Sequence, residues 1–513
     1  MAGSLFARLD QRFGTRPPAA QRQKDLQNRI ENFAHHFDIQ TLKAGRARKT
    51  KLNVVVVGGG FAGLMAANKL ALSFNVKVFE ARDRLGGRVW THLDEGGYRA
   101  VEAGGELIGY NHPTWIMLAK KFGLGFTVLT GEDAFTSLDL DSPLHLCGRL
   151  VARKEAEGIY NELGVLVNKL CVEASSIGDP YICWKAENAV DLDSVSLGEW
   201  LSKQDCSDLA RGAMEVQFSN TNGAPTSSQS YLANLAAIRG GALHGKIDDY
   251  FTQSETLRCE QGNQSLAISL AREIERQGGE VRLSTPISSI DIGESKASIT
   301  SAGGDIVEAD YVVLAVPPSL WSSRDPTGIR ISPEIPADYR MSMGRAVKYL
   351  SGVSTRFWFG RGLSPNATLD TAGLTWDGTD NQAQLGGRPL TLSLFAGGPA
   401  ADRAIEIRRD SGDESVRVFY DAEMAKIYPD YAGNVVGGPK FICWPDDCWT
   451  KAGYSCPAPG EVTRIGPFLS RPYHGRLVFA GEHCCLPFFG YMEGALQSGL
   501  ATADAIIKVE GLL

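Results

Sequence analysis

The chain has 513 residues, of which 43% are hydrophobic and 22% charged, and its formal net charge is −7. This length exceeds what one hydrophobic core usually serves, so two or three structural units are expected. The ordinary composition and negative charge exclude a low-complexity chain and give no indication of nucleic-acid binding.

The first 51 residues differ in charge from the rest of the chain. They contain eleven Lys/Arg and four Asp/Glu, which gives +7 and leaves −14 for the remainder. Leu26, Ile30, Phe33 and Phe37 recur at helical spacing, so we expect a helix within residues 21–41, followed by a solvated basic linker. The chain has neither an apolar signal segment nor a run of eighteen apolar residues, which predicts a cytoplasmic protein without a membrane span.

The next segment is typical of a phosphate-binding strand, turn and helix. The apolar run 54–57 leads into Gly58, Gly60 and Gly63, after which the sequence becomes rich in alanine and leucine. In this pattern the glycines allow a tight turn, a close approach of backbone to pyrophosphate, and helix packing on the strand. The second strand, 76–80, ends in Glu80, where an acceptor for an adenosine ribose belongs. An acid at this place favours FAD or NAD over NADP.

Two motifs at opposite ends of the chain decide between FAD and NAD. The first contains Glu80-Ala-Arg-Asp-Arg-Leu-Gly86-Gly87-Arg88 and Glu102-Ala-Gly-Gly-Glu106; the second contains Gly475-Arg-Leu-Val-Phe-Ala-Gly481-Glu482 and Gly490-Tyr491-Met492. Together they resemble the flavin amine oxidase family, which includes monoamine, polyamine and L-amino-acid oxidases. The resemblance implies an α/β fold with a Rossmann-like FAD-binding domain built from discontinuous segments, a mixed-sheet substrate domain and a helical insertion.

The same resemblance implies the residues that bind FAD. Val281 is expected to meet the adenine through its backbone. The full set of expected contacts is Gly58, Gly60, Phe61, Ala62, Gly63, Glu80, Ala81, Arg82, Gly86, Gly87, Arg88, Gly104, Gly105, Glu106, Val281, Gly481, Glu482, Tyr491 and Met492. The ten cysteines lack paired C-x-x-C spacing and no histidine completes a ligand set, so neither a metal site nor a disulfide scaffold is expected.

The order of these patterns predicts six segments along the chain. Residues 1–51 form the N-terminal arm and helix, and residues 116–250 a helical region. The FAD-binding domain takes 52–115, 251–319 and 453–513, while 320–452 form the substrate-binding domain. Within the last of these, 390–395 is expected as a strand and 414–427 as a helix.

Three residues are expected to carry the chemistry. Residues 344–348 are interpreted as a strand ending in Lys348, at a spacing from Phe357-Trp358 that resembles the family strand whose lysine holds a water against flavin N5. A buried ammonium of this kind needs a functional reason. Tyr454 and Tyr491 resemble the two aromatic walls of the family's substrate cage. Gly453 stands where members with covalent flavin carry a cysteine, which predicts non-covalent FAD.

The substrate class remains open between amines and amino acids. Leu107 occupies the position at which some family members carry a carboxylate-binding arginine, which favours a monoamine oxidase. The stretches 222–236 and 255–264 instead resemble bacterial L-amino-acid oxidases. We therefore predict oxidative deamination of L-amino acids, with hydride transfer to N5, reoxidation by O2 to H2O2, and hydrolysis of the imine to a 2-oxo acid and ammonia. A monoamine or polyamine oxidase, or a non-catalytic flavin-fold interaction protein, are the alternatives.

The expected partners follow from this prediction. They are an L-amino acid and O2, without nucleic acid, and a second copy of the chain in a homo-oligomer, with a dimer as the first expectation.

Overall fold

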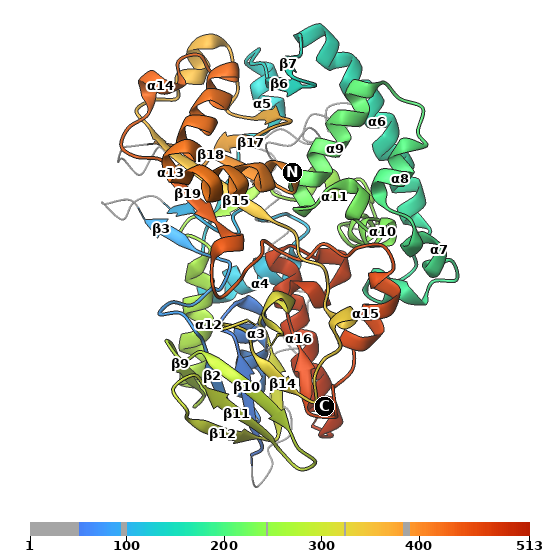
Figure 1. Cartoon of the computed structure of the whole chain (residues 1–513), viewed down its shortest axis with the longest axis vertical. Coiled ribbons are helices and arrows are strands. Elements are labelled where there is room, and N and C mark those ends of the chain that lie inside the picture. The colour runs from blue at the N-terminus through green and yellow to red at the C-terminus, as the bar shows by residue number, and fades with distance from the viewer. Residues whose placement is uncertain (1–50, 94–99, 243–244, 323–324, 383–389, 513) are drawn as a thin grey trace.

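The computed structural model describes residues 51–93, 100–242, 245–322, 325–382 and 390–512. Its first layer is a parallel sheet in the order β20-β13-β1-β2-β9 (Figure 1). The strands are β1 (Asn53–Val57), β2 (Asn75–Phe79), β9 (Glu280–Arg282), β13 (Tyr311–Leu314) and β20 (Leu477–Phe479). Because β1 lies at the centre of the sheet and is covered on both faces, its sequence is a continuous valine run. The helix expected within residues 21–41 and the basic arm lie outside the described residues.

Different layers cover the two faces of this sheet. Val54 and Val56 pack into a core with the helices α3 (Phe61–Leu70), α4 (Pro113–Phe122), α12 (Gln264–Arg276) and α16 (Met492–Val509). Val55 and Val57 pack on the opposite side against a second sheet, in the order β12-β11-β10-β14. Its strands are β10 (Ile287–Ile292), β11 (Ala297–Ser301), β12 (Ile306–Ala309) and β14 (Arg330–Ser332).

The upper half of the molecule in Figure 1 contains a mixed sheet in the order β19-β15-β18-β17-β16-β6-β7. The strands are β6 (Leu144–Leu146), β7 (Arg149–Leu150), β15 (Ala346–Val353), β16 (Ala367–Leu369), β17 (Gly373–Asp377), β18 (Leu390–Gly397) and β19 (Lys440–Cys443). Helix α13 (Pro399–Ile427) packs its buried side chains against β15 and β18, with a break in helical geometry at Gly412. The short helices η7 (Phe357–Arg361), α14 (Tyr431–Asn434) and η9 (Trp444–Asp446) connect these elements.

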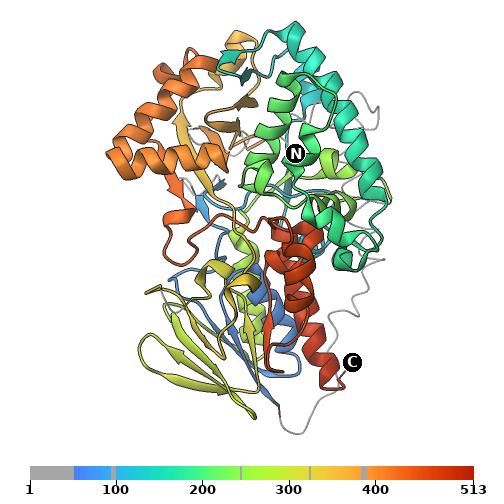
Figure 2. The same ribbon diagram turned by 45° about the vertical axis from the view of Figure 1, so that its right-hand side comes forward.

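A third core is built mainly from helices on the other side of this half, which Figure 2 brings forward. They are α6 (Arg153–Ser175), η3 (Pro180–Lys185), α7 (Ala189–Ser194), α8 (Leu197–Ser202), α9 (Asp208–Asn222), α10 (Tyr231–Gly240), α11 (Asp249–Gln253) and α15 (Glu461–Leu469). The short helices α5 (Glu132–Ser137) and η4 (Thr226–Ser228) belong to the same stretch of the chain. Residues 116–250, which were expected to be a mostly helical region, also contain short strands. Strands β6 and β7 lie within this region and extend the mixed sheet, because β6 pairs with β16.

Two small sheets and four single turns complete the described structure. β3 (Thr91–Leu93) pairs with β4 (Ala100–Glu102), and β5 (Phe126–Val128) pairs with β8 (Leu257–Cys259). The turns are η5 (Pro318–Leu320), η6 (Ala337–Tyr339), η10 (Glu482–Cys484) and η11 (Leu486–Phe488). Among the described residues, no helix combines the length and the apolar character needed to cross a membrane.

The chain returns to its first domain at its C-terminal end, where the second family motif lies. Strand β20 is added to the parallel sheet beside β13, and α16 packs along α3. The second sheet extends beyond residue 319, since β14 pairs in parallel with β10. After β14 the chain re-enters the mixed sheet at β15.

The contact between α16 and α3 depends on one glycine. A Cβ added at Gly499 would lie 2.2 Å from the carbonyl oxygen of Ala62, so no side chain fits there without moving a helix. We expect Gly499→Ala to lower the free energy of unfolding by about 1–3 kcal/mol through overpacking. The midpoint of thermal unfolding should fall accordingly.

Gly158 on α6 provides the matched control. It is exposed, and an added Cβ would have nothing within 4 Å. Gly158→Ala is therefore expected to raise stability by roughly 0.5–1 kcal/mol, the difference in helix cost between the two residues. Equal unfolding midpoints for the two variants would contradict the packing described for α16.

Candidate active site

Residues from all parts of the discontinuous domain and from the mixed sheet line one large cavity. Of the expected FAD contacts it includes Gly58, Gly60, Phe61, Ala62, Glu80, Ala81, Arg82, Gly86, Gly87, Arg88, Gly104, Gly105, Glu106, Gly481, Glu482, Tyr491 and Met492. Lys348 and Tyr454 line it as well. The structure thus brings together residues that are more than 400 positions apart in the sequence.

Two of the expected contacts do not line the cavity. A Cβ at Gly63 would lie 2.0 Å from the carbonyl oxygen of Gly58, so Gly63 serves the close packing of α3 on β1. Val281 lies inside the parallel sheet, opposite Val78. The chain leaves the sheet after Arg282 and crosses its carboxyl end, where Thr285 donates its N–H to the carbonyl oxygen of Glu80 at 2.8 Å. Thr285 and Ile287 therefore line the cavity where Val281 was expected.

The turn between β1 and α3 fits an anionic ligand. Gly58 has φ +112°, a conformation that favours glycine, and a Cβ at Gly60 would meet nothing closer than 4.0 Å. Helix α3 has no acidic residue in its first turn and no side-chain cap. Its N-terminal N–H groups therefore remain available to a phosphate.

Glu80 lies at the end of β2 with its carboxylate facing this turn. Its Oε2 accepts the N–H of Gly59 at 2.7 Å and its Oε1 accepts the N–H of Arg82 at 2.8 Å. Each carboxylate oxygen has a second lone pair. The arrangement fits the ribose hydroxyls of FAD, and it also explains why the acid must follow the strand directly.

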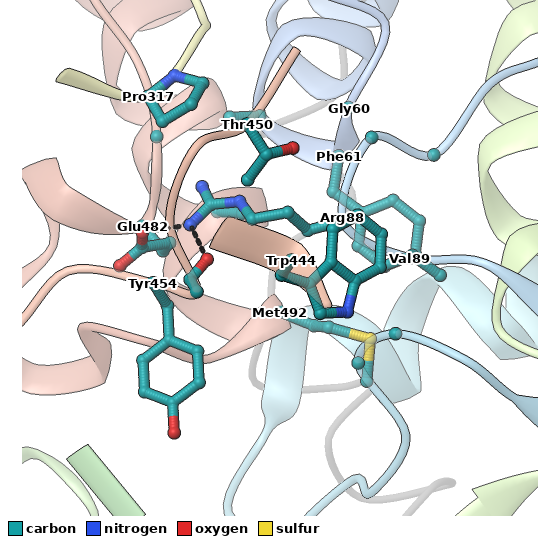
Figure 3. A pocket seen from close by; sticks show the side chains of 18 of the residues that line it. Gly60, Phe61, Arg88, Val89, Pro317, Trp444, Thr450, Tyr454, Glu482 and Met492 are labelled. Carbon is teal, nitrogen blue, oxygen red and sulfur yellow. Dashed lines mark hydrogen bonds and ion pairs between the residues drawn. The ribbon is translucent and has the colours of Figure 1, made fainter. Parts of the chain in front are cut away.

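An ion pair joins the first and last parts of the domain (Figure 3). Arg88 Nη1 donates to Glu482 Oε1 at 2.7 Å and to the carbonyl oxygen of Gly453 at 3.1 Å. Glu482 also accepts hydrogen bonds from Ser455 Oγ at 2.5 Å and from the N–H of Gly490 at 2.7 Å. Burial opposes ionisation, but Arg88 and these donors together lower the pKa of Glu482 to about 2.

Lys348 belongs to a buried cluster centred on Glu106. Its Nζ donates to Glu106 Oε2 at 2.7 Å and to the carbonyl oxygen of Glu102 at 2.9 Å. Glu106 Oε1 accepts from Arg258 Nη2 at 2.6 Å and from Trp376 Nε1 at 2.9 Å. Burial opposes ionisation of Glu106, yet Lys348 and Arg258 hold its pKa below the ordinary value. An ammonium has three donors, so one N–H of Lys348 remains for a ligand.

The local structure around Lys348 differs from the expectation in one respect. Lys348 is the third residue of β15, which continues to Val353, so it lies near the start of the strand and not at its end. Trp358 of the aromatic pair is fully buried in the core of the mixed sheet and does not line the cavity.

Both expected cage tyrosines lie on the cavity wall. The Tyr454 hydroxyl donates to the carbonyl oxygens of Thr221 at 2.8 Å and Asn220 at 3.1 Å, and in Figure 3 it points away from Arg88 and Glu482. A Cβ at Gly490 would lie 3.0 Å from the Tyr454 ring, so glycine keeps this face free. The Tyr491 hydroxyl donates to Glu255 Oε1 at 3.2 Å.

Several cavity residues had no role in the sequence interpretation. Glu255 lines the cavity and Arg258 is a buried partner of Glu106; both occur in a stretch that was noted only for its resemblance. Trp376, Phe395, Trp444 and Phe489 also line the cavity. All three residues of β8, Arg258 among them, are buried in the structure, and a buried charge needs a partner.

The chain is similar to known flavin-containing amine oxidases. A family model described as "Flavin containing amine oxidoreductase" matches residues 61–507. A putative flavin-containing monoamine oxidase, AofH, from Mycobacterium tuberculosis is 28% identical over 468 residues, which cover 89% of this chain and 96% of that protein. A flavin-containing amine oxidase from Danio rerio is 25% identical over 489 residues, covering 90% and 87%.

Solved structures give the same result. Wild-type putrescine oxidase bound to putrescine superimposes with a TM-score of 0.75 at 25% identity, covering 90% of this chain and 100% of that one. Cyclohexylamine oxidase from Brevibacterium oxydans gives a TM-score of 0.73 at 25% identity with the same coverage.

The low pKa of Glu482 predicts a pH-dependent contribution to stability. Its ordinary value is 4.5 and its value here about 2, so the contribution is complete above pH 4.5 and declines as the pH falls toward 2. Glu482→Gln removes the ion-pair partner of Arg88 and is expected to lower the free energy of unfolding by on the order of 3 kcal/mol at pH 6. Between pH 5 and pH 3, roughly the window of this linkage, its unfolding midpoint should depend less on pH than that of the parent.

The control is Glu157→Gln, which changes an exposed acid on α6. It should follow the parent throughout. If Glu482→Gln kept the parent's pH dependence, the ion pair with Arg88 would not be the source of the acid sensitivity.

Proposed function

Because the chain belongs to the family of flavin containing amine oxidoreductases, we propose that it uses FAD to oxidise an amine that carries no carboxylate on its reacting carbon. FAD is the cofactor of this family. The proposal concerns the substrate, for which the sequence favoured an L-amino acid.

The observation that supports an amine substrate is the ion pairing of the cationic side chains that line the cavity. The described lining residues include three cations, Arg82, Arg88 and Lys348. Each is ion-paired: Arg82 with Asp447, Arg88 with Glu482 and Lys348 with Glu106. A substrate carboxylate needs an available arginine or an equivalent set of donors. Among the described residues, these three cations are already engaged by carboxylates of the protein itself.

The stretches that resembled L-amino-acid oxidases have structural partners instead. Asn222 Nδ2 donates to Gln229 Oε1 at 2.7 Å and to Asn234 Oδ1 at 2.9 Å, and all three residues are buried. Arg258 is fully buried and paired with Glu106. These residues fix the helices and β8 behind the cavity wall, so their presence is compatible with an amine substrate.

The roles proposed for the chain's own residues follow from their positions. When bound, FAD supplies the two-electron oxidant that takes a hydride from the carbon next to the amine nitrogen and is reoxidised by O2. Tyr454 and Tyr491 would pack against the substrate and restrict its orientation. Lys348, held by Glu106, would present its remaining N–H to a water at flavin N5.

Attachment of FAD is proposed to be non-covalent. A Cβ at Gly453 would lie 2.9 Å from the Cβ of Ala346 and 3.0 Å from its N atom. Glycine has no sulfur to form a thioether, and the neighbouring strand leaves no room for a larger residue at this position.

Oxidation of amino acids and of their decarboxylated amines by the FAD-loaded protein tests the proposal. The pairs are L-phenylalanine with 2-phenylethylamine, L-leucine with 3-methylbutylamine, and L-ornithine with 1,4-diaminobutane. Peroxide formation and anaerobic bleaching of the flavin are measured for each. We expect kcat/KM to favour the amine by about a hundredfold or more, equivalent to about 2.7 kcal/mol, since an unpaired carboxylate would be desolvated in the cavity.

The contrary results have separate meanings. Turnover of the amino acids but not of the amines would restore the L-amino-acid oxidase predicted from the sequence. No turnover of either class by flavin-loaded protein would favour the non-catalytic interaction protein.

A further inference from the structure

Glu255 lines the cavity, but it has no role in the FAD site or in the catalysis proposed above. We propose that Glu255 binds a second cationic group of the substrate and makes the enzyme selective for diamines over monoamines; this inference rests on the proposed amine oxidation.

The position of Glu255 suits a group at the far side of the substrate. Tyr491 directly precedes α16, and the neighbouring Met492 packs on Gly105 of the FAD motif. Glu255 Oε1 accepts a hydrogen bond from the hydroxyl group of Tyr491, which is the end of that side chain furthest from the backbone. Glu255 therefore lies at the hydroxyl end of the Tyr491 side chain, on the cavity wall. A substrate that packs its reacting carbon against the ring would extend toward this carboxylate.

The charge of Glu255 differs from that of the other acids in the cavity. Glu106 and Glu482 each pair with a cation, and Glu80 accepts two backbone N–H groups. No lysine, arginine or histidine of the described segments forms an ion pair with Glu255. Burial raises its pKa because the carboxylate loses water, and the hydrogen bond from Tyr491 offsets this in part. No cation of the described residues pairs with it to supply a counter-charge. An ammonium in the cavity would supply that charge and favour the ionised form.

The backbone holds Glu255 in a conformation that its neighbours enforce. Its φ is +61°, and of the seven described non-glycine residues with positive φ it alone lines the cavity. On either side, Asn111 Nδ2 donates to Ser254 Oγ at 2.9 Å and the Thr256 N–H donates to the carbonyl oxygen of Ile108 at 2.9 Å. Strain of this kind persists where the surroundings determine it, and it is frequent at ligand sites. The carboxylate is therefore placed before the substrate arrives.

The test compares α,ω-diaminoalkanes of two to six carbons with n-alkylamines of the same length. Anaerobic calorimetry gives binding, and steady-state peroxide formation gives kcat/KM. The FAD-loaded parent should prefer the best diamine over its monoamine by at least tenfold. Glu255→Gln, which keeps an acceptor for Tyr491 without the charge, should lose that preference while its activity on the monoamine changes less than threefold.

Two further variants keep the result interpretable. Glu255→Asn tolerates positive φ and should lose the preference in the same way, which protects the test against a folding defect of the first variant. Glu260→Gln changes an exposed acid that follows β8, the strand that Glu255 precedes, and should retain the preference.

An unchanged preference in Glu255→Gln would overturn the proposal. An equal loss for diamine and monoamine would also overturn it, because Glu255 would then act on the reacting amine. Failure of the proposed function gives a different pattern: no amine is oxidised, while tighter binding of the diamine still depends on Glu255.

Discussion

The buried carboxylate of Glu106 joins three parts of the molecule at the site. It accepts from Lys348 on β15 of the mixed sheet, from Arg258 on β8, and from Trp376 on β17. Breaking such a pair by removing one partner leaves a buried charge unsatisfied, which costs far more than a surface ion pair. The relative position of the two halves around the cavity, and with it the place of the lysine ammonium, therefore depends on this one side chain.

The glutamates that line the cavity differ in their hydrogen-bonding and ion-pair partners. Glu80, Glu106 and Glu482 are satisfied by groups of the protein, and each connects segments that are distant in the sequence. Glu255 accepts only from a tyrosine hydroxyl in the described structure. A carboxylate that is placed but not neutralised attracts a cation, whereas the satisfied ones hold the cavity in shape. This distribution favours a basic amine over an amino acid as substrate.

The sequence predicted those features that local pattern and family motifs determine. The strand–turn–helix around Gly58 and the C-terminal return of the chain have the positions expected, because glycine spacing and a valine run constrain short segments. The places of Thr285 and Glu255 on the cavity wall depend on how the chain leaves β9 and how it enters β8 in three dimensions. Likewise, β6 and β7 are too short to show the alternation of apolar and polar residues that indicates a strand within a helical region. The ion partner of Lys348 could not be predicted, since Glu106 lies 242 positions upstream in the chain.

The most direct measurement is the rate at which O2 reoxidises the reduced flavin, observed by rapid mixing for Lys348→Met, Glu106→Gln and the double variant. If Glu106 positions Lys348, the lysine variant should be slower by roughly tenfold or more, or about 1.4 kcal/mol. Glu106→Gln should be slower as well, and the double variant no slower than Lys348→Met alone. Parent-like reoxidation in Lys348→Met, or effects that multiply in the double variant, would contradict this account.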